Sequence, residues 1–74
     1  MAIKIKLYGI FRIDRFKEEV CDYPSSATVR EVVEKLGISD QLLGIVLING
    51  VHAGVDDLLK DSDVLSLLPL LGGG

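Results

Sequence analysis

The residues with the clearest chemical potential are the last three, Gly72, Gly73 and Gly74, which follow the apolar run 64–71. Glycine has no side chain and tolerates positive φ, so a glycine segment can enter a channel too narrow for other residues. An extended chain spans at most about 3.3–3.6 Å per residue, which gives a reach of roughly 13 Å from Leu71 onward. This pattern is typical of a protein whose own terminal carboxylate, here on Gly74, reacts inside another protein's active site. A merely frayed chain end is the plain alternative.

The other side chains capable of chemistry form no recognisable catalytic pattern. The sequence contains no Ser/His/Asp set, Cys/His metal cluster or phosphate-binding glycine loop. His52, the only histidine, is predicted to be exposed on a strand, and Cys21, the only cysteine, to be half-buried on one. The acidic residues between 56 and 63 lack the ligand spacing of a calcium loop and are predicted to form a solvated turn. We therefore expect no metal site and no catalytic activity in the chain itself.

Size and composition restrict the remaining classes. A chain of 74 residues is one small domain, and its 49% hydrophobic content is sufficient for a compact core. No apolar run approaches the roughly 20 residues of a membrane span. The single cysteine allows no internal disulfide, which favours a cytoplasmic location. A net charge of −3 without a basic stripe disfavours nucleic-acid binding and suits a protein partner with a basic or mixed face.

The first part of the sequence predicts two strands and a helix. Residues 3–8 alternate between apolar and polar, as in a half-buried strand, and residues 15–23 form a poorer, edge-like strand that pairs with it. The connection at 9–14 is expected to pack its three apolar residues inward, and both tyrosines are expected on the sheet surface. Thr28 and Glu31 have capping-box spacing, and an apolar stripe then predicts a helix over about 29–36 that ends at Gly37.

The second part predicts three more strands. Residues 45–48 are strongly apolar, and Asn49-Gly50 is the favoured pair for a type I′ hairpin turn into a short strand at 51–53. Leu58 and Leu59 are expected to be buried anchors, and residues 61–63 to form a turn. The final strand runs over 64–70. The resulting order, β-β-α-β-β-β, predicts an α+β fold in which the first and last strands form the central pair.

This order and four local motifs resemble the β-grasp, or ubiquitin-like, fold and specifically the ubiquitin-like sulfur carriers. Similar to that family are residues 5–12 (IKLYGIFR), 27–37 (ATVREVVEKLG), 47–50 (LING), and 59–64 (LKDSDV) with Pro69 and the final glycines. The small subunit of molybdopterin synthase is the nearest type, and the thiamin sulfur carrier shares the fold. The sequence departs from the family at Ser62, where glycine is common. The resemblance implies a single β-grasp domain at 1–71, a mixed sheet with one main helix, and a flexible glycine tail at 72–74.

The resemblance also implies a chemistry centred on Gly74. In the family, an E1-like adenylyltransferase uses ATP to activate the terminal carboxylate, which then becomes a thiocarboxylate. The carrier binds no cofactor of its own, and its sulfur passes to the large subunit of molybdopterin synthase or an equivalent acceptor, for a molybdenum or tungsten cofactor. Three alternatives stay open: thiamin thiazole synthesis, conjugation to lysines as a protein modifier, and a non-catalytic β-grasp adaptor.

A docking surface is expected beside the tail. Because strand residues alternate between faces, Ser66 on the outer face implies that Leu68 and Leu70 share it, with Leu65 and Leu67 in the core. Leu47 is expected on the same side, and Leu71 adjoins it before the glycines. Exposed leucines next to the tail predict a partner-binding patch, unless a register shift buries them.

Overall fold

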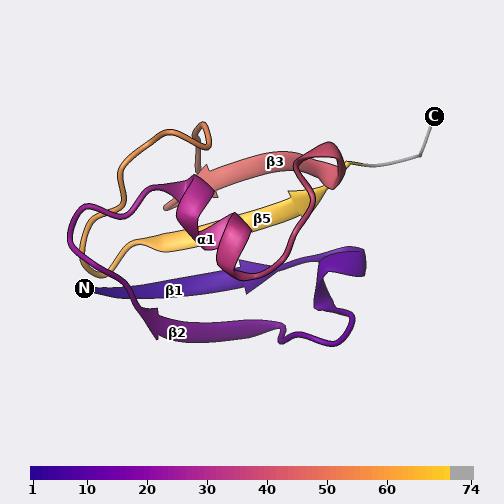
Figure 1. The fold of residues 1–74 in the computed structure, drawn as a ribbon, viewed down its shortest axis with the longest axis horizontal. Helices are drawn as coiled ribbons and strands as arrows, with labels where there is room; N and C mark the ends of the chain where they lie inside the picture. Colours follow the sequence, from indigo (N-terminus) through magenta and orange to yellow (C-terminus); the bar gives the residue numbers. More distant parts are fainter. Residues whose placement is uncertain (71–74) are drawn as a thin grey trace.

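The structure, a computed structural model, describes residues 1–70. These residues form one α-helix, five strands and two short 3₁₀ helices (Figure 1). In chain order, the elements are β1 (Ala2–Leu7), η1 (Gly9–Arg12), β2 (Glu18–Asp22), α1 (Val29–Lys35), η2 (Asp40–Leu42), β3 (Leu43–Ile48), β4 (Val51–His52) and β5 (Val64–Pro69). The predicted order of strands and helix is confirmed.

The five strands form one mixed sheet in the order β2-β1-β5-β3-β4. β1 and β5 are parallel and central, β2 is an antiparallel edge strand, and β3 is antiparallel to β5. Helix α1 lies across one face of this sheet, which makes a two-layer α+β fold (Figure 1). Since β1 and β5 run in the same direction, both strands end at the same end of the sheet, next to η1. The central pairing predicted from the sequence is confirmed.

The core lies between α1 and the sheet. Ile3, Ile5 and Leu7 of β1 are fully buried, and they alternate with half-buried residues that face the other way. Leu65 and Leu67 of β5 are also fully buried, as the alternation of the last strand predicts. The helix contributes its own apolar stripe, namely Val29, Val32 and Val33. The opposite face of the sheet, which points away from α1, is therefore not part of this core.

Turn chemistry fixes the register of these elements. The Thr28 hydroxyl accepts a hydrogen bond from the Glu31 amide at 3.4 Å, which caps α1 as predicted. Asn49 and Gly50 have φ of 53° and 81°, as a type I′ turn requires. Asn49 also binds the start of β5, because its side-chain amide donates to the Asp63 carboxylate at 2.9 Å and its carbonyl accepts from the Val64 amide at 2.9 Å. This contact explains why Asp63 is buried within an otherwise exposed turn.

The sequence expectations for Tyr23 and Leu58 are wrong. Tyr23 is only 7% exposed rather than on the sheet surface, because it continues the alternation of β2 on the side of Cys21. Its backbone amide and carbonyl both bind Met1, and the Lys35 ammonium lies 5.1 Å from the centre of its ring. Of the two expected anchors, Leu59 is buried but Leu58 is 63% exposed. Adjacent residues of an extended segment point in opposite directions, so only one of them can enter the core.

Candidate docking face and carboxyl-terminal site

The sheet face opposite α1 carries the predicted docking residues. The strand pairing places Lys6, Ser66, Leu47 and His52 in one row across four strands. Leu68 lies one row closer to the end of β5, where its partner on β3 is Ile45. Leu47 and Leu68 are half-buried, whereas Leu70, directly after β5, is 63% exposed. The expected outward placement of Leu47 and Leu68 therefore agrees with the register, while Leu71, Gly72, Gly73 and Gly74 lie outside the described residues.

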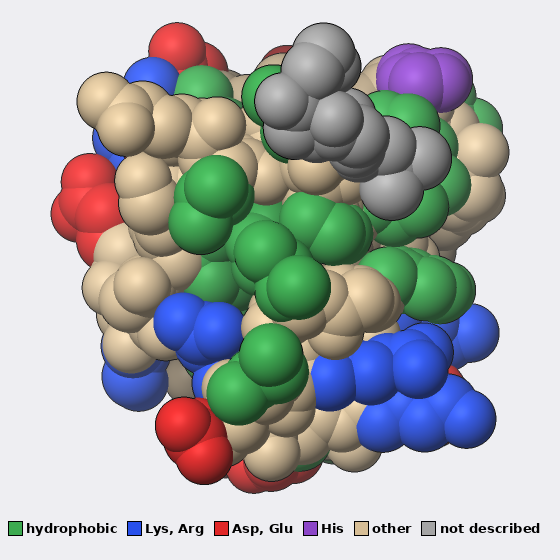
Figure 2. Space-filling model, turned by 90° about the vertical axis from the view of Figure 1, so that its right-hand side faces the viewer, with side chains coloured by type: hydrophobic (Ala, Val, Ile, Leu, Met, Phe, Trp, Pro, Cys, Tyr) green, Lys and Arg blue, Asp and Glu red, His purple; other side chains and the backbone are tan. Residues whose placement is uncertain are grey.

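Further hydrophobic side chains lie around the end of β5, and the sequence reasoning missed them. The expectation that all three apolar residues of the 9–14 connection pack inward is wrong: Phe11 enters the core, but Ile10 and Ile13 are 51% and 63% exposed. Ile10 lies in η1, and Ile13 directly follows it and donates its amide to the Ile10 carbonyl at 3.2 Å. Residues i and i+3 of such a turn lie on the same side, so both isoleucines point outward when Phe11 points inward. Leu42 of η2 is 48% exposed. Figure 2 shows hydrophobic side chains gathered across the end of the molecule at which β5 terminates.

The end of β5 is held tightly by its neighbours. The Leu70 amide donates to the carbonyl of Leu42 at 2.7 Å. A β-bulge between Leu43 and Ile45 brings Gly44 so close that a Cβ there would lie 2.9 Å from backbone atoms of Pro69 and Leu70. The structure thus fixes the position of Leu70, four residues before Gly74. We call this arrangement of Leu42, Gly44, Pro69 and Leu70 the β5 clamp.

Replacing Gly44 with alanine is expected to open the β5 clamp. The added Cβ would meet backbone rather than a flexible side-chain end, so the strand must shift, at a cost of about 1–3 kcal/mol in the free energy of unfolding. Gly54→Ala is the matched control, because the nearest atom to its added Cβ is Asp57 Oδ2 at 3.9 Å. The control should be neutral or gain up to about 1 kcal/mol. Urea unfolding of both variants tests this, and equal stabilities would contradict the clamp.

Arginine side chains brace η1 against the rest of the fold. Arg15 Nε donates to the Leu36 carbonyl at 2.9 Å, and its other nitrogens donate to the carbonyls of Phe11 and Gly37 at 3.2 and 3.3 Å. The cation therefore joins the connection after β1 to the carboxyl end of α1, where positive charge is favourable. Arg12 Nε donates to the Leu7 carbonyl at 2.8 Å. Both contacts stabilise the segment that carries the exposed isoleucines.

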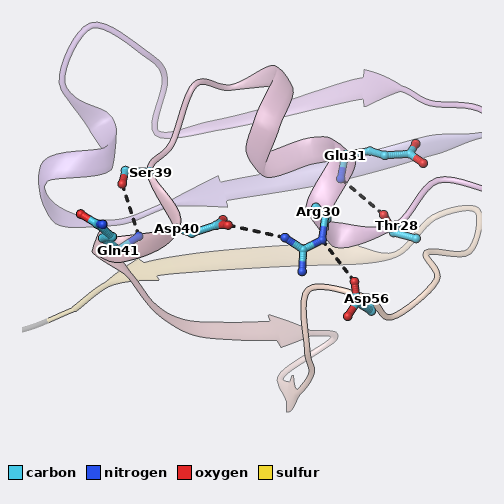
Figure 3. Close-up of polar contacts among 7 residues, drawn as sticks. All are labelled: Thr28, Arg30, Glu31, Ser39, Asp40, Gln41 and Asp56. Atoms are coloured by element: carbon cyan, nitrogen blue, oxygen red, sulfur yellow. Dashed lines mark hydrogen bonds and ion pairs between the residues drawn. The ribbon is translucent and has the colours of Figure 1, made fainter.

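Arg30 links helix α1 to η2 and to the loop after β4 (Figure 3). Its guanidinium lies 3.5 Å from the Asp40 carboxylate at the start of η2 and 3.2 Å from the Asp56 carboxylate in the loop after β4. All three side chains are well exposed, so these ion pairs add little stability. They do restrict η2, which supplies the Leu42 carbonyl that binds Leu70.

A hollow of about 420 Å³ lies next to Arg30 and is lined by β3 and by residues 52–55. Its charged lining side chains, Arg30 and Asp40, already pair with each other.

The remaining side chains with chemical potential lie apart from one another. His52 is exposed on β4, as predicted, and Cys21 is half-buried on β2, as predicted. Burial raises the pKa of the Cys21 thiol, and the neighbouring Glu19 carboxylate raises it further. Within residues 1–70, no group of three or more His, Cys, Asp or Glu side chains could hold a metal ion. In the same residues, no helix has the length and hydrophobicity to cross a membrane.

The thiol of Cys21 is expected to react slowly. A raised pKa lowers the thiolate fraction near neutral pH, and the thiolate is the nucleophile. Alkylation by iodoacetamide should therefore be slower in the folded protein than in the same protein unfolded in urea. As the pH is raised, the alkylation rate of the folded protein should level off at a higher pH than that of the unfolded chain, because the thiol pKa is higher in the folded state. Equal rates in the two states would show that the environment of Cys21 does not protect it.

Comparison with known proteins agrees with this fold. A structure from Pyrococcus furiosus described as molybdopterin converting factor, subunit 1, is similar with a TM-score of 0.78 and 24% identity, over 96% of this chain and 99% of that one. SAMP1 from Haloferax volcanii has a TM-score of 0.78 and 21% identity over the whole of both chains. Subunits 1 and 2 of the molybdopterin-converting factor from Helicobacter pylori form a complex whose matching chain has a TM-score of 0.67 and 20% identity, again over both whole chains.

A comparison with curated proteins gives no match. The ThiS family, in contrast, matches residues 5–74. The match covers the second half of β1 and everything after it, including the helix, β5 and the segment beyond the β5 clamp. The β-grasp architecture, with its five-stranded mixed sheet and one main helix, is the fold of the similar structures. The chain therefore belongs to the ThiS family of ubiquitin-like sulfur carriers.

Proposed function

We propose that this protein carries sulfur as a thiocarboxylate on Gly74 and donates it in the synthesis of a molybdopterin or tungstopterin cofactor. The observation that carries the proposal is the position of Leu70. The β5 clamp fixes this residue at the end of the central strand, beside exposed hydrophobic side chains. The four residues that follow this rigid anchor, 71–74, reach roughly 13 Å when extended. This distance suits delivery of a terminal group into a partner's active site.

The proposed chemistry starts from the Gly74 carboxylate, which is a poor electrophile and must first be activated. The Gly74 carboxylate attacks the α-phosphorus of ATP in the active site of an E1-like adenylyltransferase, and pyrophosphate leaves. Sulfur at the oxidation level of hydrosulfide (HS⁻) then attacks the acyl carbon of the adenylate and displaces AMP, which leaves with one of the former carboxylate oxygens, so that the acyl carbon carries one oxygen and one sulfur. The carrier contributes docking and delivery, and the activating partner contributes ATP binding and catalysis. We propose that Gly72 and Gly73 allow entry into a narrow channel, since neither has a side chain.

We propose that the docking face consists of Leu47, Leu68, Leu70 and Leu71, together with the exposed residues of η1 and η2. Hydrophobic side chains at the end of β5 would be covered by the same partner that receives the terminal residues. The Helicobacter pylori complex of subunits 1 and 2 supports a large-subunit partner for this chain. By this proposal, the protein is the small, non-catalytic subunit of such a complex, and it acts in the cytoplasm.

Two similar structures support the molybdopterin branch over thiamin thiazole synthesis, because both are described as molybdopterin-converting factor subunits. The likeness to SAMP1 supports a second candidate, a protein modifier that is joined through Gly74 to lysines of its targets. The two functions need the same activated terminus and differ in the acceptor. An acceptor that takes only the sulfur regenerates the carboxylate, whereas an acceptor lysine retains the whole protein.

A transfer experiment distinguishes these acceptors. The thiocarboxylate form of the protein would be mixed with the large subunit of molybdopterin synthase and its pterin precursor, and in parallel with thiazole synthase and its substrates. We expect loss of sulfur from the protein only in the first mixture, with recovery of the unmodified mass. Transfer only to thiazole synthase would contradict the proposed pathway. Conjugates of higher mass in cell extracts, linked through Gly74, would favour the modifier.

A further inference from the structure

A polar cleft lies next to the docking face, at the corner where β1 ends and β2 begins. It has a volume of about 280 Å³. Its lining consists of Lys6, Leu7, Tyr8, Arg12, Lys17 and Glu18. We call it the basic cleft. None of these side chains has a role in the proposed chemistry of Gly74, so the concentration of charge needs another explanation.

The charge of the basic cleft is opposite to that of the whole protein. The chain has a net charge of −3, yet five of its eight Lys and Arg residues lie between positions 4 and 17. Three of these cations line the cleft, against the single carboxylate of Glu18. That carboxylate is already shared, because it lies 3.6 Å from Lys4 Nζ and 3.9 Å from Lys6 Nζ. Within residues 1–70, Lys17 forms no ion pair, so the cleft retains an excess of positive charge.

The aromatic wall of the cleft fixes the orientation of one cation. The Arg12 guanidinium carbon lies 5.5 Å from the centre of the Tyr8 ring, and Arg12 Nε donates to the Leu7 carbonyl. The two terminal nitrogens of this guanidinium form no hydrogen bond within the described part of the chain. A guanidinium held in this way can donate two parallel hydrogen bonds to one carboxylate. The basic cleft therefore has a guanidinium oriented to bind a carboxylate, in addition to its positive charge.

The basic cleft is continuous with the docking face. Lys6 pairs with Ser66 and Leu7 with Leu67 in the parallel β1–β5 ladder, so Tyr8 lies at the level of Leu68. Gly9 follows, and its Cα region contacts the Pro69 ring, since a Cβ there would lie 3.1 Å from Pro69 Cγ. Figure 2 shows Lys and Arg side chains grouped beside the hydrophobic ones on the same end of the molecule. A partner that covers Leu68 and Leu70 must therefore also meet the basic cleft.

We propose that the basic cleft binds the carboxylates of an acidic segment on the protein partner that covers the docking face. This inference rests on the proposed function, because it assigns the chemistry of the partner's surface. A protein segment is favoured over a nucleic acid because the cleft adjoins hydrophobic side chains and the remainder of the surface is acidic. The contact orients the partner with respect to Leu70 and speeds association through opposite charge.

The test uses the full chain labelled with ¹⁵N and a short oligoglutamate peptide blocked at both ends. Amide chemical shifts would be followed during titration, with an oligoglutamine peptide of the same length as the neutral probe. We expect shift changes confined to residues 6–18 with oligoglutamate only, and weaker binding when salt is added. Lys17→Glu should weaken binding about tenfold or more, because it places like charge in the cleft. Lys60→Glu changes the net charge equally, outside the cleft, and should leave binding unchanged.

Two results would overturn the proposal. One is equal weakening by Lys17→Glu and Lys60→Glu, which would mean that net charge alone governs binding. The other is the absence of localised shift changes at the highest peptide concentration. Both variants replace exposed side chains, and unchanged dispersion of the other amide signals would verify their folding. Because no activating enzyme takes part, failure here is distinguishable from failure of thiocarboxylate formation at Gly74.

Discussion

One residue added after Gly74 is expected to lower the rate of adenylation at least about 100-fold without changing the stability of the fold. The reacting carboxylate would move by about 3.3–3.6 Å, the length of one extended residue. A displacement of only about 1 Å can cost a hundredfold in rate at an enzyme active site. The β5 clamp makes the effect large, since Leu70 cannot slide back to compensate. Exchange of labelled pyrophosphate into ATP by the cognate adenylyltransferase measures the rate.

The controls for this experiment separate position from chemistry. Removal of the added residue by a carboxypeptidase should restore the rate, because the Gly74 carboxylate returns to its place. Gly73→Ala keeps the length and adds one methyl group, and it should also impair activation if the channel excludes side chains. Both proteins should show the urea midpoint of the unaltered chain. Full activation of the extended protein, without trimming, would contradict the proposed role of Gly74.

Leu65→Ala is expected to have the largest effect on stability. Leu65 is fully buried in central strand β5, where it pairs with Ile5 on β1 and Ile48 on β3. Truncation of a buried leucine costs about 2–5 kcal/mol, through lost burial and the cavity that remains. Small domains have a total of only about 5–15 kcal/mol, so the variant should be marginally folded. Urea unfolding, followed by circular dichroism, measures the loss.

Leu58→Ala is the matched control for this substitution. Leu58 is also a leucine in the second half of the chain, but 63% of it is exposed. Its truncation should change the free energy of unfolding by no more than about 0.5 kcal/mol. A similar loss in the two variants would mean that the buried layer between α1 and the sheet does not dominate the stability of this domain.

Most of the fold could be predicted because local signals agree with one another. The alternation of residues 3–8, the capping residue Thr28 and the turn Asn49-Gly50 each specify one backbone conformation, and the structure has all three. The parallel pairing of β1 with β5 is not local. It was predicted from the order of the elements, β-β-α-β-β-β, which is also the order on which the resemblance to the β-grasp fold rests.

The site could be predicted only in part. The polar residue Ser66 indicated which residues of β5 lie on each face of the sheet, and on that basis Leu68 was placed outward. The exposure of Ile10 and Ile13 could not be predicted, because an apolar triplet looks the same whether a connection packs it inward or winds it into a 3₁₀ turn. The β5 clamp depends on contact between Gly44 and Pro69, residues far apart in the sequence. Only the paired strands bring them together.

Ser62 illustrates how a departure from the family pattern is tolerated. Its φ is +71°, in the left-handed region that favours glycine. The Ser62 amide donates to the Ala2 carbonyl at 2.8 Å, and the Asp61 carboxylate accepts from the Ala2 amide at 2.8 Å. These bonds to the start of β1 hold the turn in its strained conformation. The turn that leads into β5 therefore forms with serine in place of glycine.

Intact-mass analysis tests the central claim most directly. The protein would be incubated with its cognate E1-like adenylyltransferase, ATP and a sulfur donor, then digested to locate any change. We predict a mass increase equal to exchange of one oxygen for sulfur, located in the peptide that contains Gly74 and dependent on ATP. An unchanged mass, or sulfur found instead as a persulfide on Cys21, would contradict the claim that the carboxyl terminus carries the sulfur.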